Sequence, residues 1–158
     1  MDTEAADMYL QAVQRNGKNV DAKIGLKQTG QKLLEDKLST FFKSMAVSDA
    51  KGQSVSAYLE AKSYQERVEH LGVILEIPDH YKYDFEKVKG EHLVDLYNDG
   101  QALLEIQDFP SAERKFSEIA KLEPGYKDAS SLQAVAYLEP LYRAAKVDLA
   151  AEHYRKAY

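Results

Sequence analysis

LYNDGQALLEIQDFPSAERKFSEIAKLEPGYKDA, residues 96–129, predicts two helices joined by a tight turn. In its first half, small or apolar residues recur mostly at the three- and four-residue spacing of one face of a helix. These residues are Leu96, Gly100, Leu103, Leu104 and Ile106. A second series with helical spacing comprises Ala112, Phe116, Ile119 and Leu122. The stretch therefore predicts an amphipathic helical hairpin.

The break between the two series carries residues that favour the start of a helix. Pro110 lacks an amide hydrogen and fits the first turn of a helix, where that hydrogen would have no intrahelical partner. Asp108 can accept hydrogen bonds from the free amides of the same turn. Pro124 and Gly125 end the second series. Because the connection is short, we expect the two helices to lie antiparallel.

This hairpin resembles the tetratricopeptide repeat, a helical hairpin of about 34 residues. The matching residues are Leu96, Gly100 and Leu103 in the first helix, Phe109 in the turn, and Ala112, Phe116 and Pro124 in the second helix. Two departures are Leu96 in place of Trp and Ile119 in place of a small residue. Gly100 and Ala112 are small where two helix backbones come close, so that Phe116 can fill the space beside them. The resemblance implies a right-handed array of antiparallel hairpins, of the kind found in bacterial tetratricopeptide-like proteins with lengthened helices.

Length and composition are typical of one helix-rich domain, with 158 residues, 44% hydrophobic and 30% charged. No run is apolar enough to span a membrane, and no signal peptide is visible. The absence of cysteine excludes disulfides and thiolate zinc sites. The net charge of −5 argues against nucleic acid or anionic lipid as the main partner. Localisation stays open between the cytoplasm and, if a signal peptide was removed, the periplasm or cell envelope.

The N-terminal part of the chain predicts half a repeat followed by long helices. Residues 1–17 carry Ala5, Tyr9 and Ala12, which match the second-helix series without a first helix, so we expect another segment or chain to cover them. Residues 18–92 predict three long helices, over 20–45, from beyond Ser48 to about 76, and from about 81 into the hairpin. The matching aromatics stand further apart than the family's repeat length, and we expect the lengthened helices to pack as a three-helix bundle.

The C-terminal part of the chain predicts the repeats themselves. Residues 93–126 form the best-matching repeat, and residues 127–158 predict a last repeat of two helices. Ala134 and Tyr137 match its first helix, and Ala150, Tyr154 and Ala157 match its second. The expected fold is thus a single all-α, tetratricopeptide-like domain of about seven helices, three of them long. Both ends of the array are expected to be open.

In the tetratricopeptide family, the first helices of successive repeats line a concave groove that holds peptides. When the sequence is aligned with the family through Gly100 and Leu103, and through Ala134 and Tyr137, the resemblance implies that nine positions face such a groove. They are Val94, Tyr97, Gln101, Leu104, Glu105, Ser131, Val135, Leu138 and Glu139. The Lys, Asn and Arg residues with which some family members clamp a C-terminal carboxylate are not at these positions. The expected ligand is therefore an extended or helical peptide.

Motifs of catalysis and cofactor binding are missing from the sequence. The four histidines include no HExxH arrangement, and there is no GxGxxG, phosphate loop or GxSxG elbow. His92 and Asp95 lie one helical turn apart, but a solvated or hydrogen-bonded histidine explains them more simply than a metal site. We expect no enzymatic activity and no cofactor.

The sequence leads to functional hypotheses of different classes. The first is a protein–protein interaction module, an adaptor or assembly subunit that holds a peptide or helix of another protein in its groove. The alternative is a structural spacer or self-associating repeat segment of a larger protein, a homo-oligomer through its open ends with no peptide ligand. A third, weaker hypothesis is a small-molecule pocket between the long helices, lined by Tyr81, Phe85 or His92. Light scattering separates the first two, and a ligand-dependent shift in melting temperature tests the third.

Overall fold

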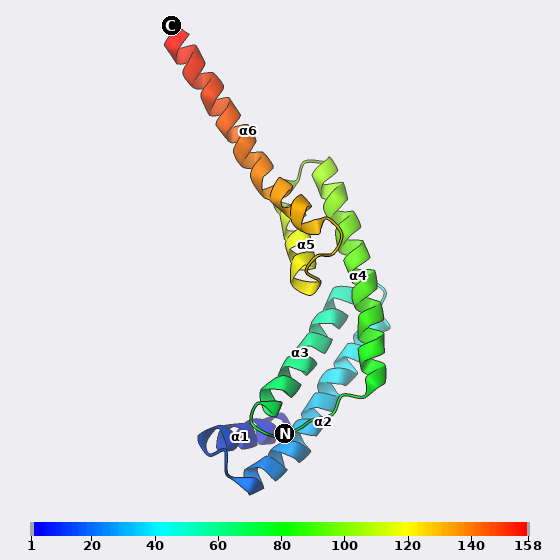
Figure 1. Cartoon of the computed structure of the whole chain (residues 1–158). Coiled ribbons are helices and arrows are strands. Elements are labelled where there is room, and N and C mark those ends of the chain that lie inside the picture. Colours follow the sequence, from blue (N-terminus) through cyan, green and yellow to red (C-terminus); the bar gives the residue numbers. More distant parts are fainter. Residues whose placement is uncertain (1, 158) are drawn as a thin grey trace. The chain divides into compact units, whose positions relative to one another are not determined.

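This computed structural model describes residues 2–157. Six α-helices and the segments that connect them form this part of the chain, which contains no strand (Figure 1). They are α1 (Asp2–Arg15), α2 (Val20–Met45), α3 (Lys51–Glu69), α4 (Asp79–Glu105), α5 (Phe109–Leu122) and α6 (Ala129–Ala157). Successive helices pack as pairs, α1 with α2, α2 with α3, and α5 with α6. The all-α prediction is confirmed, and the predicted number of about seven helices is close to the six observed.

Two compact units divide the chain, Met1–Glu91 and His92–Tyr158, so α4 contributes residues to both. Each unit has its own set of buried side chains and is described separately.

The central helix of the first unit is α2, which spans the residues predicted for it. The side chain of Asn19 caps its first turn by accepting a hydrogen bond from the amide of Ala22 at 3.0 Å. Its buried face recurs with helical spacing and comprises Ala22, Leu26, Gly30, Leu33, Leu34, Leu38 and Phe41. This face explains the length of the helix, because a run of 26 residues gains its stability from packing against α1 and α3.

The buried face of α1 is displaced by one residue from the predicted Ala5, Tyr9 and Ala12. The buried side chains are Ala6, Leu10 and Val13, and Tyr9 is 39% exposed. Alanines stand at both 5 and 6, so helical spacing alone does not separate two adjacent stripes. The ring of Tyr9 nevertheless covers Gly25 of α2, where an added Cβ would lie 2.5 Å from ring atoms.

The second long helix ends at Glu69, and the prediction that it continues to about residue 76 is wrong. Gly72 has a φ of +79°, and its amide donates to the carbonyl of Glu69. The amide of Val73 reaches back to the carbonyl of Val68 at 3.4 Å, which completes a Schellman-type helix end. Val73 and Leu75 are still buried, although they lie outside the helix, and the helical spacing of Leu75 from Val68 and Leu71 explains the wrong prediction.

Aromatic rings join α2, α3 and the first part of α4 within the first unit. The Phe41 ring centroid lies 5.3 Å from that of Tyr58 and 6.3 Å from that of Tyr81. Tyr58 in turn stacks on Phe85 with centroids 4.1 Å apart. These contacts agree with the predicted bundle of long helices. They also show that Phe85, which the third hypothesis placed in a pocket, is a buried packing residue.

The second unit contains the predicted hairpin, formed by the C-terminal part of α4 and by α5. Asp108 caps α5 by accepting a hydrogen bond from the amide of Ser111, and Pro110 lies in its first turn, as predicted. The shared core comprises Leu93, Leu96, Tyr97, Ala112, Phe116, Ile119, Ala129 and Ala136. Because the last two residues belong to α6, the first turns of that helix complete the same core.

The predicted last repeat is one continuous helix, since α6 runs over 29 residues without the turn expected between two helices. The residues around the expected turn, RAAKVDLAAE at 143–152, are mostly strong helix formers and include no Gly or Pro. Pro140 lies inside the helix. Ala150 and Tyr154 are therefore helical, as expected, but they belong to the same helix as Ala134 and not to a separate antiparallel one.

Candidate functional site

Tyr97 connects α4 to the start of α6 in the second unit. Its hydroxyl donates a hydrogen bond to the Asp128 carboxylate at 2.5 Å and accepts one from the side-chain amide of Gln101 at 3.3 Å. Its ring meets those of Phe116 and Tyr126 edge-on, with centroids 6.2 and 6.1 Å apart respectively. Tyr97 is only 9% exposed, so this side chain is occupied in holding three elements together.

The charges around Tyr97 fix its protonation state. The hydrogen bond to Asp128, which needs the hydroxyl proton, raises the pKa of Tyr97 above its ordinary value, and desolvation adds to the shift. Lys127 places its ammonium group 4.2 Å from the Tyr97 ring centroid and 5.4 Å from that of Tyr126. A cation at these distances is attracted by the ring faces. The Tyr97 hydroxyl is therefore hydrogen-bonded to two side chains of the same unit, Asp128 and Gln101, both of which are themselves exposed to solvent.

The nine positions implied by the resemblance fall into two groups. Tyr97 is buried, and Leu104 packs against the core. Gln101 donates a hydrogen bond to the Tyr97 hydroxyl. Glu139 is half-buried and accepts a hydrogen bond from Arg143 at 2.9 Å. Gln101 is exposed although it bonds to Tyr97, and the exposed side chains without a contact of this kind to Tyr97 are Val94, Glu105, Ser131, Val135 and Leu138. A ligand could reach this second group without displacing core side chains.

Arg143 marks the point on α6 where contact with the hairpin ends. Its guanidinium donates to the side chain of Gln107 at 2.7 Å and lies 5.0 Å from the ring centroid of Phe109. Gln107 lies in the connection between α4 and α5, and Phe109 is the first residue of α5. Beyond this arginine, residues 144–156 of α6 are exposed throughout.

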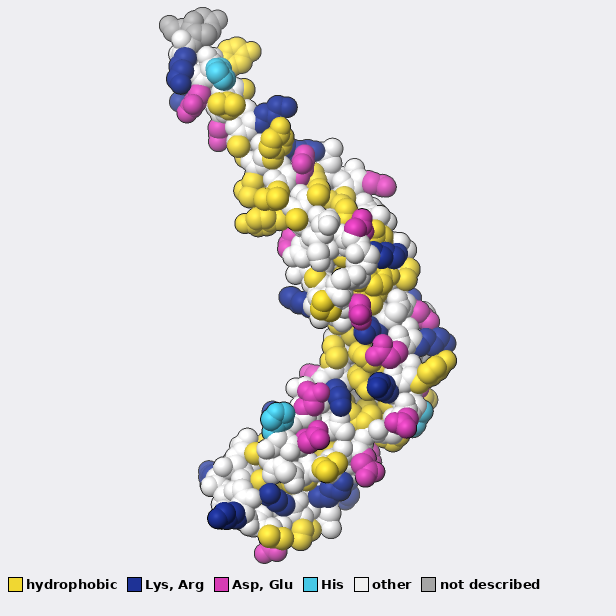
Figure 2. Space-filling view, viewed as in Figure 1, with side chains coloured by type: hydrophobic (Ala, Val, Ile, Leu, Met, Phe, Trp, Pro, Cys, Tyr) yellow, Lys and Arg dark blue, Asp and Glu magenta, His cyan; other side chains and the backbone are white. Residues whose placement is uncertain are grey.

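The exposed part of α6 carries large apolar side chains on more than one side of the helix (Figure 2). They are Val135, Tyr137, Leu138, Leu141, Tyr142, Val147, Leu149 and Tyr154, each 49–72% exposed. Apolar side chains distributed around a helix are typical of a helix that is covered on several sides. Single exposed leucines are ordinary, but a contiguous apolar surface marks an interaction site.

Reasoning from the resemblance found only Val135 and Leu138 of this surface. The others escaped because residues 127–158 were expected to fold back into a second helix that would cover them. The available signal was the composition of residues 134–154, which is apolar without a clear polar face.

Metal sites and membrane-spanning helices were looked for among the described residues. Within residues 2–157, no group of three or more His, Asp or Glu side chains is arranged to hold a metal ion. His92 instead lies 3.2 Å from the carboxylate of Glu118 on α5. No helix in this part of the chain has the length and apolarity needed to cross a membrane.

Comparisons with models of known protein families, with characterised proteins and with solved structures found no match to this chain. The class of protein is therefore defined by its architecture, an all-α protein whose neighbouring helices pack in pairs. The tetratricopeptide assignment and the handedness of the array stay predictions.

Proposed function

We propose that this protein is a protein–protein interaction module, an adaptor or assembly subunit, and that α6 is the helix through which it contacts its partner. The observation that carries the proposal is the set of large apolar side chains that α6 leaves exposed between Val135 and Tyr154. Ordinary surface helices have one polar face toward water, whereas Leu141, Val147 and Leu149 project in different directions around this helix.

The energetics of a lone helix support the same conclusion. Helices stabilised only by their own hydrogen bonds are marginal in water at lengths below about 12–15 residues. The part of α6 beyond Arg143 has no packing partner among the described residues to add stability. A partner that covers Tyr142, Leu149 and Tyr154 would supply the missing apolar burial, worth roughly 25 cal/mol per Å² removed from water.

Exposed side chains in the first turns of α6 and on the neighbouring part of the unit extend the proposed contact surface. Val94, Ser131, Val135 and Leu138 are exposed and neutral, and they belong to the positions that line the groove in the resembling family. An extended or helical peptide of a partner protein would fit the mixed apolar and polar character of these positions. The resemblance to the tetratricopeptide repeat supports this assignment.

Affinity capture from extracts of the source cells tests the proposal. We would compare the wild-type protein with a Leu141→Glu/Leu149→Glu variant, because both side chains are more than half exposed and their loss leaves the core intact. A matched control is Phe42→Glu/Val47→Glu, which alters two equally exposed side chains in the first unit. A protein that is captured by the wild type and the control but lost with the α6 variant would support the proposal. Equal capture by all three would contradict it.

The second candidate function is a structural spacer or self-associating segment without a peptide ligand. The same exposed helix favours it, because a second copy of the chain can supply apolar cover as well as a different protein can. Light scattering of the purified wild type and the α6 variant separates the two functions. A wild-type dimer that becomes a monomer in the variant favours the spacer, and a monomer in both favours the interaction module.

A further inference from the structure

A second surface feature lies in the first unit, where the chain between α3 and α4 runs alongside α2. The side-chain amide of Gln31 on α2 makes two hydrogen bonds to this connection. Its Nε2 donates to the backbone carbonyl of Glu76 at 3.0 Å, and its Oε1 accepts from the backbone amide of Glu76 at 2.9 Å. Gln65 of α3 donates to the carbonyl of Leu75 at 2.8 Å, and Lys27 of α2 donates to the carbonyl of Ile74. These bonds hold an extended segment at a fixed distance from the helix.

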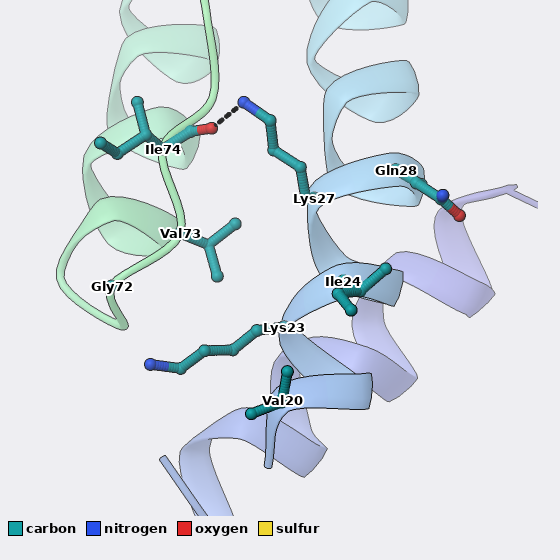
Figure 3. A pocket seen from close by; sticks show the side chains of 8 residues that line it. All are labelled: Val20, Lys23, Ile24, Lys27, Gln28, Gly72, Val73 and Ile74. Carbon is teal, nitrogen blue, oxygen red and sulfur yellow. Dashed lines mark hydrogen bonds between the residues drawn. The ribbon is translucent and has the colours of Figure 1, made fainter. Parts of the chain in front are cut away.

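The space between this segment and the first turns of α2 is a cavity of about 440 Å³ (Figure 3). Its walls are largely aliphatic and come from Val20, Ile24, Val73 and Ile74, of which Val73 is buried. The other three are 54–66% exposed, so apolar surface faces water at this point. The volume falls within the range of about 300–1,000 Å³ that is common for small-molecule sites.

The charge at this cavity is positive, although the whole chain carries a net charge of −5. Lys23 and Lys27 line it together with Gln28 and Gly72, and no acidic side chain is among its lining residues. Figure 3 shows both lysines extending from α2 toward the connecting segment, one on each side of Val73. Like charges at positions i and i+4 of a helix repel one another, and an anion close to both would relieve that repulsion.

Lys23 is the more available of the two cations. Lys27 is engaged with the Ile74 carbonyl, which is a neutral acceptor. The ammonium group of Lys23 lies 3.1 Å from the position that a Cβ on Gly72 would occupy, so the glycine leaves room for it. The cavity also lies at the N-terminal turn of α2, where the helix dipole adds positive potential.

We propose that this cavity binds a small aliphatic carboxylate, with the carboxylate at Lys23 and the chain against Val20, Ile24 and Ile74. Charge complementarity selects the anionic headgroup, because the site presents two ammonium groups and no acidic side chain. The aliphatic walls select the tail, which gains free energy from leaving water. This site is independent of α6 and of the proposed protein-binding function.

Octanoate is the probe with which we would test the site, using the full chain and its amide signals in two-dimensional NMR. Saturable shifts at Ile24, Gly72 and Ile74 are expected, and octanol should bind about tenfold more weakly because it lacks the charge. Octyltrimethylammonium, with the opposite charge on the same tail, should bind least. Equal affinity for octanoate and octanol would overturn the proposal, as would the absence of saturable shifts at these residues.

Substitution of the lysine gives a second, independent test. Lys23→Met keeps the aliphatic stem but removes the charge, and it should weaken octanoate binding about tenfold. Lys32→Met on the same helix is the matched control, because Lys32 is exposed and lies outside the cavity. Identical octanoate affinities for the two variants, with unchanged circular dichroism, would contradict the role of Lys23.

A peptide carboxylate is the competing occupant, and acetyl-Ala-Ala-Leu provides the comparison. The proposed site should prefer octanoate, because its tail can follow the aliphatic walls without burying peptide groups. Tighter saturable binding of the tripeptide at Gly72 and Ile74 would overturn the assignment to a small molecule.

Discussion

The ring of Phe116 on α5 lies directly against Gly100 on α4, where an added Cβ would come within 2.7 Å of the ring. The first unit contains the same relationship between the ring of Tyr9 and Gly25. In both pairs a glycine in a helix allows the aromatic side chain of the neighbouring helix to pack against the backbone. Phe116 is fully buried in this arrangement, so the hairpin depends on the absence of a side chain at residue 100.

Gly100→Ala is expected to destabilise the protein despite the better helix propensity of alanine. The new methyl group must displace the Phe116 ring, and overpacking of this kind costs about 1–3 kcal/mol. Gly90→Ala on the same helix is the control, because a Cβ there meets no atom within 4 Å and the propensity gain is about 1 kcal/mol. Urea denaturation measures both. A Gly100→Ala variant as stable as Gly90→Ala would show that the ring can move aside.

Tyr97→Phe is expected to lower the free energy of unfolding and to weaken its dependence on alkaline pH. The hydrogen bond to Asp128 raises the pKa of folded Tyr97 above its ordinary value of 10.0. The stabilisation is therefore complete below about pH 10 and is lost as pH rises through the folded pKa. Denaturation at pH 8 and at pH 10.5 should show a smaller decrease for the variant than for the wild type. Tyr58 and Tyr64, whose pKa values are also raised, keep part of the dependence in both proteins.

Tyr64→Phe is expected to leave the protein as stable as the wild type or more stable, by up to about 1 kcal/mol. The Tyr64 hydroxyl is buried without a hydrogen-bond partner among the described residues, so its removal ends a desolvation cost. The hydroxyl lies beside Gly30, 3.1 Å from the position of an added Cβ, and the rest of the buried ring is unchanged in Phe. Thermal or urea unfolding measures the difference. A loss of more than 1 kcal/mol would mean that the hydroxyl has a bonding partner in solution, such as a buried water.

Leu141→Glu and Leu149→Glu are expected to change the free energy of unfolding of the isolated chain by less than about 0.5 kcal/mol each. Both side chains are exposed, at 55% and 58%, and contribute little to the core of the second unit. Leu96→Ala, at a buried position of the same unit, should by contrast cost about 2–5 kcal/mol. If the glutamates destabilise the purified protein as strongly as Leu96→Ala, α6 is already covered in solution, and light scattering would then reveal self-association.

Elements that are stabilised by residues close together in the chain were predictable from the amino-acid pattern. Residues 20–45 carry a cap at Asn19 and an unbroken apolar stripe, so the helix has the length that the pattern predicts. The turn at Asp108 and Pro110, and the pairing of Gly100 with Phe116, also follow from residues close together in the chain. The hairpin was predictable because its stabilising groups lie within about one repeat length of each other.

Which side chains are covered depends on contacts between elements, which the apolar pattern does not contain. Val73 and Leu75 continue an apolar pattern, yet Gly72 ends the helix and side chains of Gln31 and Gln65, distant in sequence, hold the segment extended. Tyr97 fits a groove position by spacing, but Asp128 binds its hydroxyl from another element. The physical reason is that helical periodicity indicates which residues are apolar together, whereas burial depends on which other element reaches them. For α6, no described element reaches residues 144–156, and their apolar side chains are left exposed.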